Sequence, residues 1–164
     1  MRAHFEGTIR PAAPADVKAL GRLGALLVQV HHEFDRDRFI APTPRTGSGY
    51  GGFLAGQLKR KDVVVLVAEE AEAVIGYTYA ALEGADWLTL RGPAGVIYDL
   101  IVDPAHRKQG VGLRLLNEAI AALQGLGAPR VMLSTAAPNA AAQRLFAGAG
   151  FRPTMVEMTR EYPR

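Results

Sequence analysis

The spacing of apolar positions along the first third of the chain predicts one strand followed by two helices. A short strand is expected at Thr8–Arg10, and the apolar residues after it recur every three or four positions as far as His31. That spacing is typical of an amphipathic helix. The segment Phe34–Gly52 carries proline and glycine throughout and predicts a loop, and a second helix is expected at Phe53–Lys59.

The middle of the chain is rich in β-branched and aromatic residues, which predict the strands of a core sheet. The segments Asp62–Glu70 and Val74–Leu82 are joined by a short turn, which favours an antiparallel hairpin. The segment Val96–Pro104 is expected to form a third long strand of this sheet, which its proline ends.

The last third of the chain returns to alternating helices and strands. Helical spacing begins at Gly110, a strand is expected at Arg130–Ala136, and Asn139 is a good cap for a further helix. The segment Thr154–Tyr162 predicts a last strand. The complete order is β-α-α-β-β-β-α-β-α-β, an α/β (α+β) fold with a mixed central sheet.

Composition narrows the class of protein without identifying it. The 164 residues are 49% hydrophobic and 21% charged, a balance typical of one globular domain. The net charge of +3, with no run of five like charges, weakly favours an anionic ligand and does not require nucleic acid. The densest apolar run, Val63–Ala68, is too short to cross a membrane. The lack of cysteine excludes disulfides, zinc-thiolate sites and a cysteine nucleophile, and it fits a cytoplasmic protein.

The turn RKQGVG at Arg107–Gly112, between a strand and a helix, has the features of an anion site. The first amides of a helix have no partner within the helix, and the helix dipole adds positive charge there. Glycine at positions 110 and 112 allows a bulky anion to approach these amides, which indicates a phosphate or pyrophosphate site. The glycines alone are equally compatible with a tight turn that only permits close packing. Formal positive charge near the turn comes from Arg107, Lys108 and Arg114.

Two motifs resemble those of the GCN5-related N-acetyltransferases, the GNAT family. VDPAHRKQGVGLRLL at Val102–Leu116 is similar to motif A of the family, a strand ending V-x-P followed by R/Q-x-x-G-x-G/A. NAAAQRLFAGAGF at Asn139–Phe151 is similar to motif B, N-x-x-A-x-x-x-Y-x-x-x-G-F, and IRPAAPADV resembles the family's first strand and helix start. The resemblance implies a single N-acetyltransferase domain over residues 1–164, with the sheet splayed between its fourth and fifth strands.

The same resemblance implies a binding site for acetyl-CoA, the cosubstrate. The pyrophosphate would lie on the motif A turn, and the pantetheine arm would pair as an extra strand along Leu100–Val102. Asn139 matches the family asparagine that bonds the pantetheine, although it equally suits a helix cap. The residues so implied in cofactor binding are Leu100, Ile101, Val102, Arg107, Lys108, Gln109, Gly110, Val111, Gly112, Leu113, Arg114, Asn139 and Phe146.

The implied chemistry is direct attack of a primary amine on the thioester, and four positions are its candidate catalytic residues. Backbone amides near Leu100 would face the developing oxyanion. Asp99 would bind a cationic amine or relay its proton, because IYDLIVDP resembles the pattern of polyamine acetyltransferases; otherwise it only orders its own strand. Ser134 stands where some relatives have a glutamate. Phe146 replaces the tyrosine that usually protonates the CoA sulfur, and a phenyl ring donates no proton.

This replacement keeps a second interpretation open, a catalytically weak or inactive GNAT-like protein that binds acyl-CoA. Water, Ser134, Tyr98 or the ammonium proton itself could take the role of the acid. Tyr98 is otherwise expected on the opposite face of its strand, in the core. A phosphate- or nucleic-acid-binding module is the weakest alternative.

The remaining expectations concern the acceptor and possible partners. A polar segment after the first helix contains His31, His32, Glu33, Asp35 and Asp37. It matches no zinc spacing, so no metal is expected, and it is either a solvated loop or an acidic border that attracts a positive acceptor. Trp87 either lines the acceptor pocket or caps the core. The expected partner is a small-molecule or peptide amine, with a homodimer possible and neither nucleic acid nor membrane involved.

Overall fold

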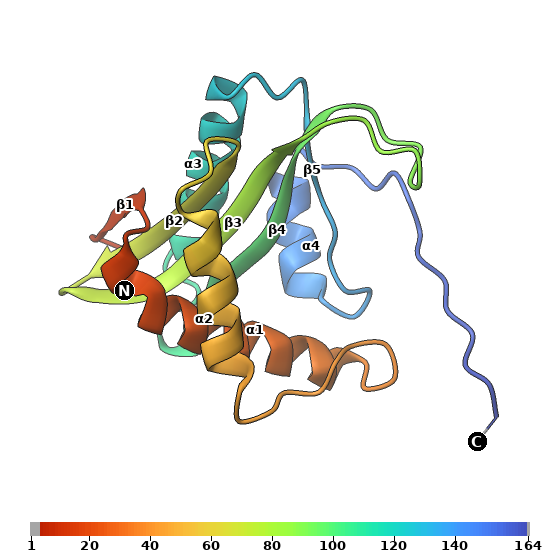
Figure 1. The fold of residues 1–164 in the computed structure, drawn as a ribbon, viewed down its shortest axis with the longest axis horizontal. Coiled ribbons are helices and arrows are strands. Elements are labelled where there is room, and N and C mark those ends of the chain that lie inside the picture. Colours follow the sequence, from red (N-terminus) through yellow and green to blue (C-terminus); the bar gives the residue numbers. More distant parts are fainter. Residues whose placement is uncertain (1–3, 164) are drawn as a thin grey trace.

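A computed structural model of the protein describes residues 4–163, and these form one five-stranded sheet with helices on both faces (Figure 1). The strands are β1 (Thr8–Pro11), β2 (Val63–Glu70), β3 (Ala73–Glu83), β4 (Ala94–Val102) and β5 (Val131–Leu133). The helices are α1 (Val17–Phe34), α2 (Thr46–Gln57), α3 (Val111–Gly125) and α4 (Ala140–Gly148), with short 3-10 turns η1 (Pro14–Asp16) and η2 (Pro104–His106).

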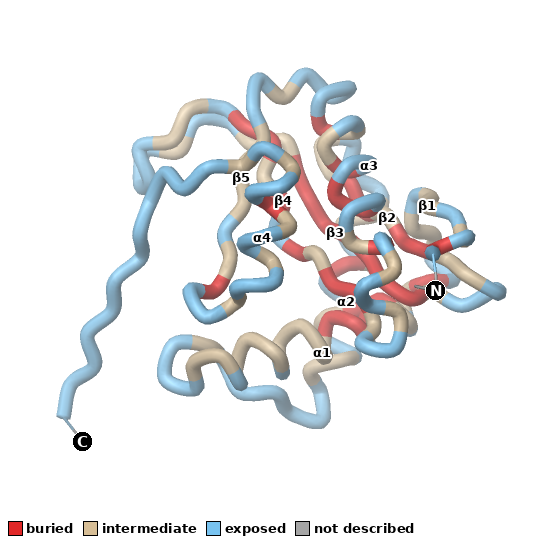
Figure 2. Tube along the Cα trace, turned by 180° about the vertical axis from the view of Figure 1, so that it is seen from behind, coloured by how far each residue is buried: buried red, intermediate tan, exposed pale blue. Residues whose placement is uncertain are grey.

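The two faces of the sheet have separate hydrophobic cores. Leucines of α1 and α2 pack with Tyr77 and Tyr79 of β3 on one face. Leucines of α3 and the Phe146 ring of α4 pack with Ile97 of β4 on the other. Figure 2 shows the buried residues concentrated in the central strands and in the helix surfaces that face them. Each face of β4 therefore meets a different pair of helices.

The strand order is sequential from β1 to β5, with antiparallel neighbours except at the last pair. The predicted hairpin between β2 and β3 is confirmed, and its turn has Ala71 and Glu72 at φ values of 47° and 63°. Two successive left-handed residues are typical of a tight turn that matches the twist of the strands. Strand β5 runs parallel to β4 and pairs with it only between residues 95–97 and 131–133. Beyond Ile97, the edge of β4 that faces β5 is unpaired among the described residues, at the predicted opening between the fourth and fifth strands.

The prediction of a loop over Phe34–Gly52 is wrong in its second half, because helix α2 begins at Thr46. Two glycines of this helix, Gly47 and Gly51, allow it to pack closely against α1. A Cβ added at Gly21 of α1 would lie 2.4 Å from the Gly47 carbonyl oxygen, and one at Gly51 would lie 3.0 Å from the Val17 carbonyl oxygen. The backbones of α1 and α2 are thus in contact, which only residues without side chains allow.

The C-terminal part of the predicted sheet is also shorter than expected. Strand β5 covers only Val131–Leu133, so Ser134 lies just beyond its end and is exposed. The predicted strand Thr154–Tyr162 is absent, and this segment is an exposed extended chain. Its sequence has the pattern of a strand, but no strand lies beside it among residues 4–163 to complete its hydrogen bonds.

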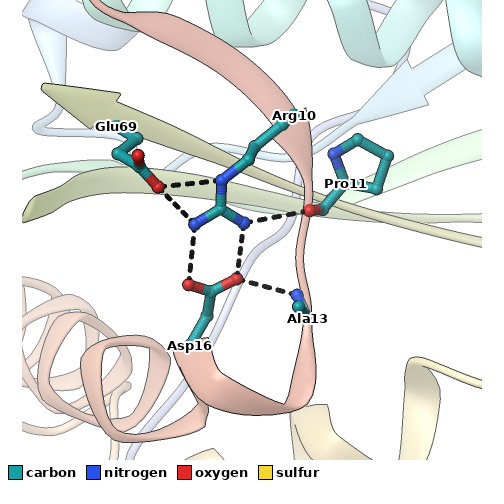
Figure 3. Close-up of polar contacts among 5 residues, drawn as sticks. All are labelled: Arg10, Pro11, Ala13, Asp16 and Glu69. Carbon is teal, nitrogen blue, oxygen red and sulfur yellow. Dashed lines mark hydrogen bonds and ion pairs between the residues drawn. The ribbon is translucent and has the colours of Figure 1, made fainter. Parts of the chain in front are cut away.

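A cluster around Arg10 fixes the start of α1 against the edge of the sheet (Figure 3). The Arg10 guanidinium donates to both Asp16 carboxylate oxygens at 2.8 and 2.9 Å, and its other edge pairs with Glu69 of β2. The same Asp16 carboxylate accepts a hydrogen bond from the Ala13 amide at 2.7 Å. The hydrogen bonds from Arg10 hold the pKa of Asp16 below its usual range. The cluster joins β1, η1 and β2 and so sets the direction in which α1 crosses the sheet.

Candidate active site

Strand β4 contains a β-bulge that decides which side chains face the layer of α1 and α2. In the register with β3, Tyr79 pairs with Asp99 and Ala80 pairs with Ile97, so Tyr98 is an extra residue. A bulge of this kind breaks the alternation of side chains and bends the strand. Tyr98 stacks on the Tyr79 ring at 5.3 Å, and Asp99 reaches the Tyr77 hydroxyl, so both residues lie on the same face. The prediction that Tyr98 lies on the opposite face in the core is wrong, and its side chain is 49% exposed.

The Asp99 carboxyl is buried, and two phenols hold one of its oxygens. Its Oδ2 accepts hydrogen bonds from Tyr50 Oη at 2.6 Å and from Tyr77 Oη at 2.9 Å. The carbonyl of Asp99 accepts a third bond from the Thr78 hydroxyl at 2.8 Å. Within residues 4–163, Oδ1 of Asp99 has no hydrogen-bond donor of its own. The carboxyl is thus fixed in orientation with one oxygen left for a further donor.

Burial raises the pKa of the Asp99 carboxyl above its ordinary value, although the hydrogen bonds from Tyr50 and Tyr77 and the nearby His31 oppose this shift. Burial, together with the Asp99 charge, also raises the pKa of both phenols far above their usual range. The phenols therefore remain proton donors, and the group at this site that exchanges protons most readily is the carboxyl. A carboxyl with a raised pKa is suited to general base catalysis near neutral pH.

The sequence alone did not reveal the two tyrosines that hold Asp99. Tyr50 belongs to the first half of α2, residues 46–52, which the sequence pattern assigned to a loop. Its ring occupies a space that a glycine of α1 provides, because a Cβ added at Gly24 would lie 2.2 Å from Tyr50 Cδ1. The sequence did contain one indication of close helix packing, the spacing of glycines on the two segments. These glycines are three residues apart at positions 21 and 24 and four apart at positions 47 and 51.

A pocket lies beside Tyr98, at the end of β3 and in the loop that follows it. The Tyr98 hydroxyl donates to Glu83 Oε1 at 2.7 Å. Burial is the main cause, and the hydrogen bond to Glu83 the second, of a rise in the pKa of Tyr98 to about 12. Trp87 is 87% exposed, so it lines this pocket and does not cap the core. The pocket residues are Glu83, Gly84, Ala85, Asp86, Trp87, Leu88, Arg91 and Tyr98.

The predicted anion turn forms the start of α3, as the sequence indicates. Gly110 caps the helix in the left-handed region at a φ of 90°, and the first amide bonded back within the helix is that of Arg114, 3.1 Å from the Gly110 carbonyl. The backbone N–H groups of residues 111–113 therefore have no hydrogen-bond acceptor within the helix. A Cβ at Gly112 would have ordinary contacts at 3.7 and 3.8 Å with Leu145 and Val102.

The side chains around this turn differ in what they can offer an anion. Lys108 is exposed and adopts a φ of 61°, and Leu113 is 43% exposed. Val111 is 1% exposed, so only its amide can reach a ligand. Gln109 Nε2 donates to the Ala105 carbonyl at 3.4 Å.

The two arginines of the turn are held by the backbone. Arg107 Nε donates to the Val102 carbonyl at 3.0 Å. The Arg114 guanidinium lies 4.7 Å from the centre of the Phe5 ring and donates to the Gly7 carbonyl at 3.1 Å. Arg114 is therefore tied to the N-terminal segment.

The other candidate positions lie on the two sides of the opening between β4 and β5. Ile101 and Val102 are buried, and Leu100 packs on the cluster that contains the Phe146 ring. Phe146 is 9% exposed, and its ring meets the Phe151 ring edge to face with centres 6.0 Å apart. Asn139 caps α4, because its Oδ1 accepts a hydrogen bond from the Ala142 amide at 3.2 Å. The cap role of Asn139 is confirmed.

The predicted polar segment begins inside α1 and not after it, because His31, His32 and Glu33 belong to the end of that helix. Its side chains bond to nearby backbone groups. His31 Nδ1 lies 2.8 Å from the Leu27 carbonyl oxygen, and its ring meets Phe34 and Phe39 edge to face. Nδ1 of His32 lies 3.0 Å from the Phe39 carbonyl oxygen, and Asp35 Oδ1 accepts hydrogen bonds from two amides that follow it. No group of three or more histidine, aspartate or glutamate side chains within residues 4–163 is arranged to hold a metal ion. Within the same residues, no helix has both the length and the apolar character to span a membrane.

Comparison with known proteins identifies the class. The model of the acetyltransferase (GNAT) family matches residues 27–151, which is most of the chain. The chain therefore belongs to the GNAT acetyltransferase family.

Particular relatives are similar to the chain in sequence or in fold. A mycothiol acetyltransferase from Thermobispora bispora is 35% identical over 96 residues, which are 56% of this chain and 31% of that protein. The matched part is thus about a third of the relative's length. A transcriptional regulator from Bacillus halodurans C-125 has a TM-score of 0.73 at 23% identity, over 96% of this chain and all of that one. Glucosamine-6-phosphate N-acetyltransferase from Arabidopsis thaliana has a TM-score of 0.68 at 18% identity, over 96% of this chain and 99% of its own. At these identities the two structures show the shared fold.

Proposed function

We propose that the protein transfers the acetyl group of acetyl-CoA to a primary amine, carried by a small molecule or a peptide. The observation that supports this most directly is the Asp99 carboxyl, held by two phenols through one oxygen and open to a donor through the other. It directly precedes Leu100, along the edge of β4 that lacks a neighbouring strand. The Asp99 carboxyl, a proton acceptor, is thus adjacent to unpaired backbone of β4. Direct transfer to an amine requires both, one to take the proton of the amine and the other to position the thioester.

The motif A turn is the proposed binding site for the pyrophosphate of acetyl-CoA. The amides of Val111, Gly112 and Leu113 would donate to it, with Arg107 and Lys108 adding positive charge. The free edge at Leu100–Val102 would pair with the amide groups of the pantetheine arm. Asn139, already a helix cap, would add a further hydrogen bond from the opposite side of the opening.

The proposed reaction needs no covalent enzyme intermediate. An ammonium group bound at Oδ1 of Asp99 gives one proton to the carboxylate, and the free amine attacks the thioester carbonyl carbon. A C–N bond forms to give a tetrahedral intermediate, and a backbone amide near Leu100 stabilises its oxyanion. The C–S bond then breaks and the nitrogen loses its second proton. The CoA thiolate takes up either this proton or one from water, Ser134 or Tyr98, because Phe146 has no proton to give.

The acceptor is proposed to be a cation when it binds. Glu83 and Asp86 place two carboxylates in the pocket beside Tyr98 against one cation, Arg91, and the Asp99 carboxyl follows Tyr98 at the bulge outside this pocket. Cations are attracted to such a site, and the exposed Trp87 ring offers a surface for an apolar or cationic part of the acceptor. The partial likeness to mycothiol acetyltransferase supports acetyl transfer without naming the acceptor.

A second function, binding of acyl-CoA with little or no turnover, is favoured by Phe146 alone. A direct assay separates the two functions. Purified protein, acetyl-CoA and a panel of primary amines should release free CoA, and mass spectrometry should show an acetylated product. Retention of acetyl-CoA without release across a broad panel would favour the second function. A protein that retains no CoA would contradict both.

Replacing Phe146 by tyrosine is expected to raise kcat and leave the affinity for acetyl-CoA nearly unchanged. The new hydroxyl would restore a proton donor for the leaving thiolate. The increase should be smaller than the about 10²-fold that a positioned acid typically supplies, because a thiolate leaves readily. Single-turnover kinetics and isothermal titration with CoA measure the two quantities. Lower turnover in this variant would show that the phenyl ring itself packs against the thioester.

A further inference from the structure

The segment before β1 lies against the turn that opens α3. The Phe5 amide donates a hydrogen bond to the Gln109 carbonyl at 3.0 Å, so the two segments are joined through their backbones. The Phe5 ring is 1% exposed and belongs to the same hydrophobic cluster as Val111 and Leu115 of α3. A segment at the beginning of the chain is therefore in contact with the turn that forms the proposed pyrophosphate site.

Arg114 holds this segment from the side of α3. Its guanidinium lies over the Phe5 ring, with Cζ 4.7 Å from the ring centre, and it donates to the Gly7 carbonyl at 3.1 Å. A cation over an aromatic face is attracted by the electron density of the ring. Gly7 leaves no room for a side chain, because a Cβ there would lie 2.1 Å from the Glu69 carbonyl oxygen. Phe5, Gly7 and Arg114, here called the clasp, thus form one packed unit.

The hydrogen bond from Phe5 fixes the direction of one peptide group in the turn. The peptide bond between Gln109 and Gly110 is trans, so its carbonyl and its N–H point in opposite directions. Because the carbonyl points to Phe5, the Gly110 N–H points away from the clasp. This N–H has no hydrogen-bond acceptor within residues 4–163. It is therefore a fourth free donor at the start of α3, next to those of residues 111–113.

The same peptide group could turn over if the clasp did not hold it. Glycine adopts positive and negative φ with similar ease, and Gly110 has a φ of 90°. Lys108 is at a φ of 61°, a strained conformation that persists only when the surroundings hold it. Turning the peptide over would put the Gln109 carbonyl oxygen where the Gly110 N–H now points. A partial negative charge would then face an anion, and the turn would repel a diphosphate.

We propose that Phe5 and Arg114 are positioning residues of the pyrophosphate site, which they hold in its binding conformation through the peptide group between Gln109 and Gly110. This inference rests on the proposed function, because the ligand concerned is the diphosphate of acetyl-CoA. The resemblance to the family implied that Arg114 binds the cofactor itself. In the structure its guanidinium is instead engaged by the Phe5 ring and the Gly7 carbonyl, so its effect on the diphosphate is indirect.

A double-mutant cycle on CoA affinity tests this indirect role. Phe5→Leu keeps an apolar side chain for the core and removes the aromatic face, and Arg114→Gln removes the cation. Each single variant should weaken CoA binding about fivefold, the effect of losing one cation–π contact. The double variant should bind no more weakly than the weaker single variant, because both changes disrupt the same contact. Isothermal titration measures the four affinities. Losses that multiply would show that Arg114 contacts the diphosphate directly, and they would overturn the proposal.

A shorter ligand separates positioning of the turn from a general loss of stability. Pantetheine lacks the diphosphate, so its affinity, followed by NMR titration, should be the same in the wild type and in both single variants. Equal losses for pantetheine and CoA would overturn the proposal. The matched control Arg130→Gln removes the same charge from an exposed residue near the beginning of β4, whereas the turn follows the end of that strand. This control should bind CoA as the wild type does.

Hydrogen exchange in the protein without ligand gives a readout that does not depend on the cofactor. The Phe5 amide should exchange at least tenfold faster in Arg114→Gln than in the wild type, because its bond to the Gln109 carbonyl opens more often. Unchanged exchange of this amide, or unchanged CoA affinity of the two single variants, would overturn this inference alone. A wild-type protein that binds no CoA would instead overturn the proposed function, and this inference with it.

Discussion

Replacing Asp99 by asparagine is expected to lower kcat/KM for amine acetylation by about 10²–10⁴-fold, the typical contribution of a general base. The amide is close in shape to the carboxyl, and its oxygen can still accept the hydrogen bonds from Tyr50 and Tyr77. What the variant loses is the charge that binds an ammonium group and the ability to take its proton. Steady-state kinetics with the best acceptor of the panel measure the change.

The pH dependence separates this catalytic role from a purely structural one. In the wild type, the acid limb of kcat/KM should follow the raised pKa of Asp99, and in the asparagine variant that limb should be absent. Asp62, whose side chain is about half exposed and pairs with Arg60, provides a matched control as Asp62→Asn. This variant should keep both the rate and the pH profile. An asparagine variant with wild-type rates would exclude Asp99 as the base.

Asp99→Asn is also expected to be more stable than the wild type at neutral pH. Burial raises the pKa of Asp99 in the folded chain above its unfolded value, so the folded state binds the proton more tightly. The stability that Asp99 contributes is therefore greatest below the unfolded pKa of about 3.9 and decreases as the pH rises through the folded pKa. The difference in unfolding free energy between variant and wild type should grow over that window and then level off. Denaturant titrations at several pH values measure it.

The two GNAT motifs and the elements that carry them could be predicted from the sequence because their signals are local. A strand ending at proline, two glycines and a helical repeat fix the turn before α3 within about fifteen residues. Asn139 could likewise be recognised as a cap from its own neighbours, and the structure confirms that role. Such features are determined mainly by residues that are close in the sequence, and tertiary packing has little influence on them.

The features that sequence reasoning missed all depend on contacts between distant segments. The first half of helix α2, residues 46–52, is rich in glycine and was predicted as a loop, because its packing against the backbone of α1 is not visible in the sequence. The bulge at Tyr98 follows from the register of two strands, and strict alternation put this side chain on the wrong face. Because of both errors, the hydrogen bonds from Tyr50 and Tyr77 to Asp99 could not be anticipated. The segment Thr154–Tyr162 has the pattern of a strand, but no strand lies beside it among residues 4–163.

Replacing Gly112 by glutamate is expected to weaken acetyl-CoA binding by at least about 10²-fold, which corresponds to about 2.8 kcal/mol. A Cβ at this position faces Leu145 of α4 and Val102 of β4, so the new side chain would enter the opening beside the amides of residues 111–113. There it would exclude a diphosphate by its volume and repel it by its like charge. Isothermal titration with CoA, or retention on a CoA resin, measures the loss.

The fold itself should tolerate this change, so the test reports on binding. A Cβ at Gly112 has only ordinary contacts, the nearest at 3.7 Å, and an acidic residue in the first turn of a helix interacts favourably with the helix dipole. The melting temperature should therefore be unchanged or slightly raised. Asn117→Glu, an exposed change of the same charge further along α3, should leave CoA binding intact. If Gly112→Glu bound CoA as tightly as the wild type, the diphosphate could not lie on these amides, and the proposed cofactor site would have to be abandoned.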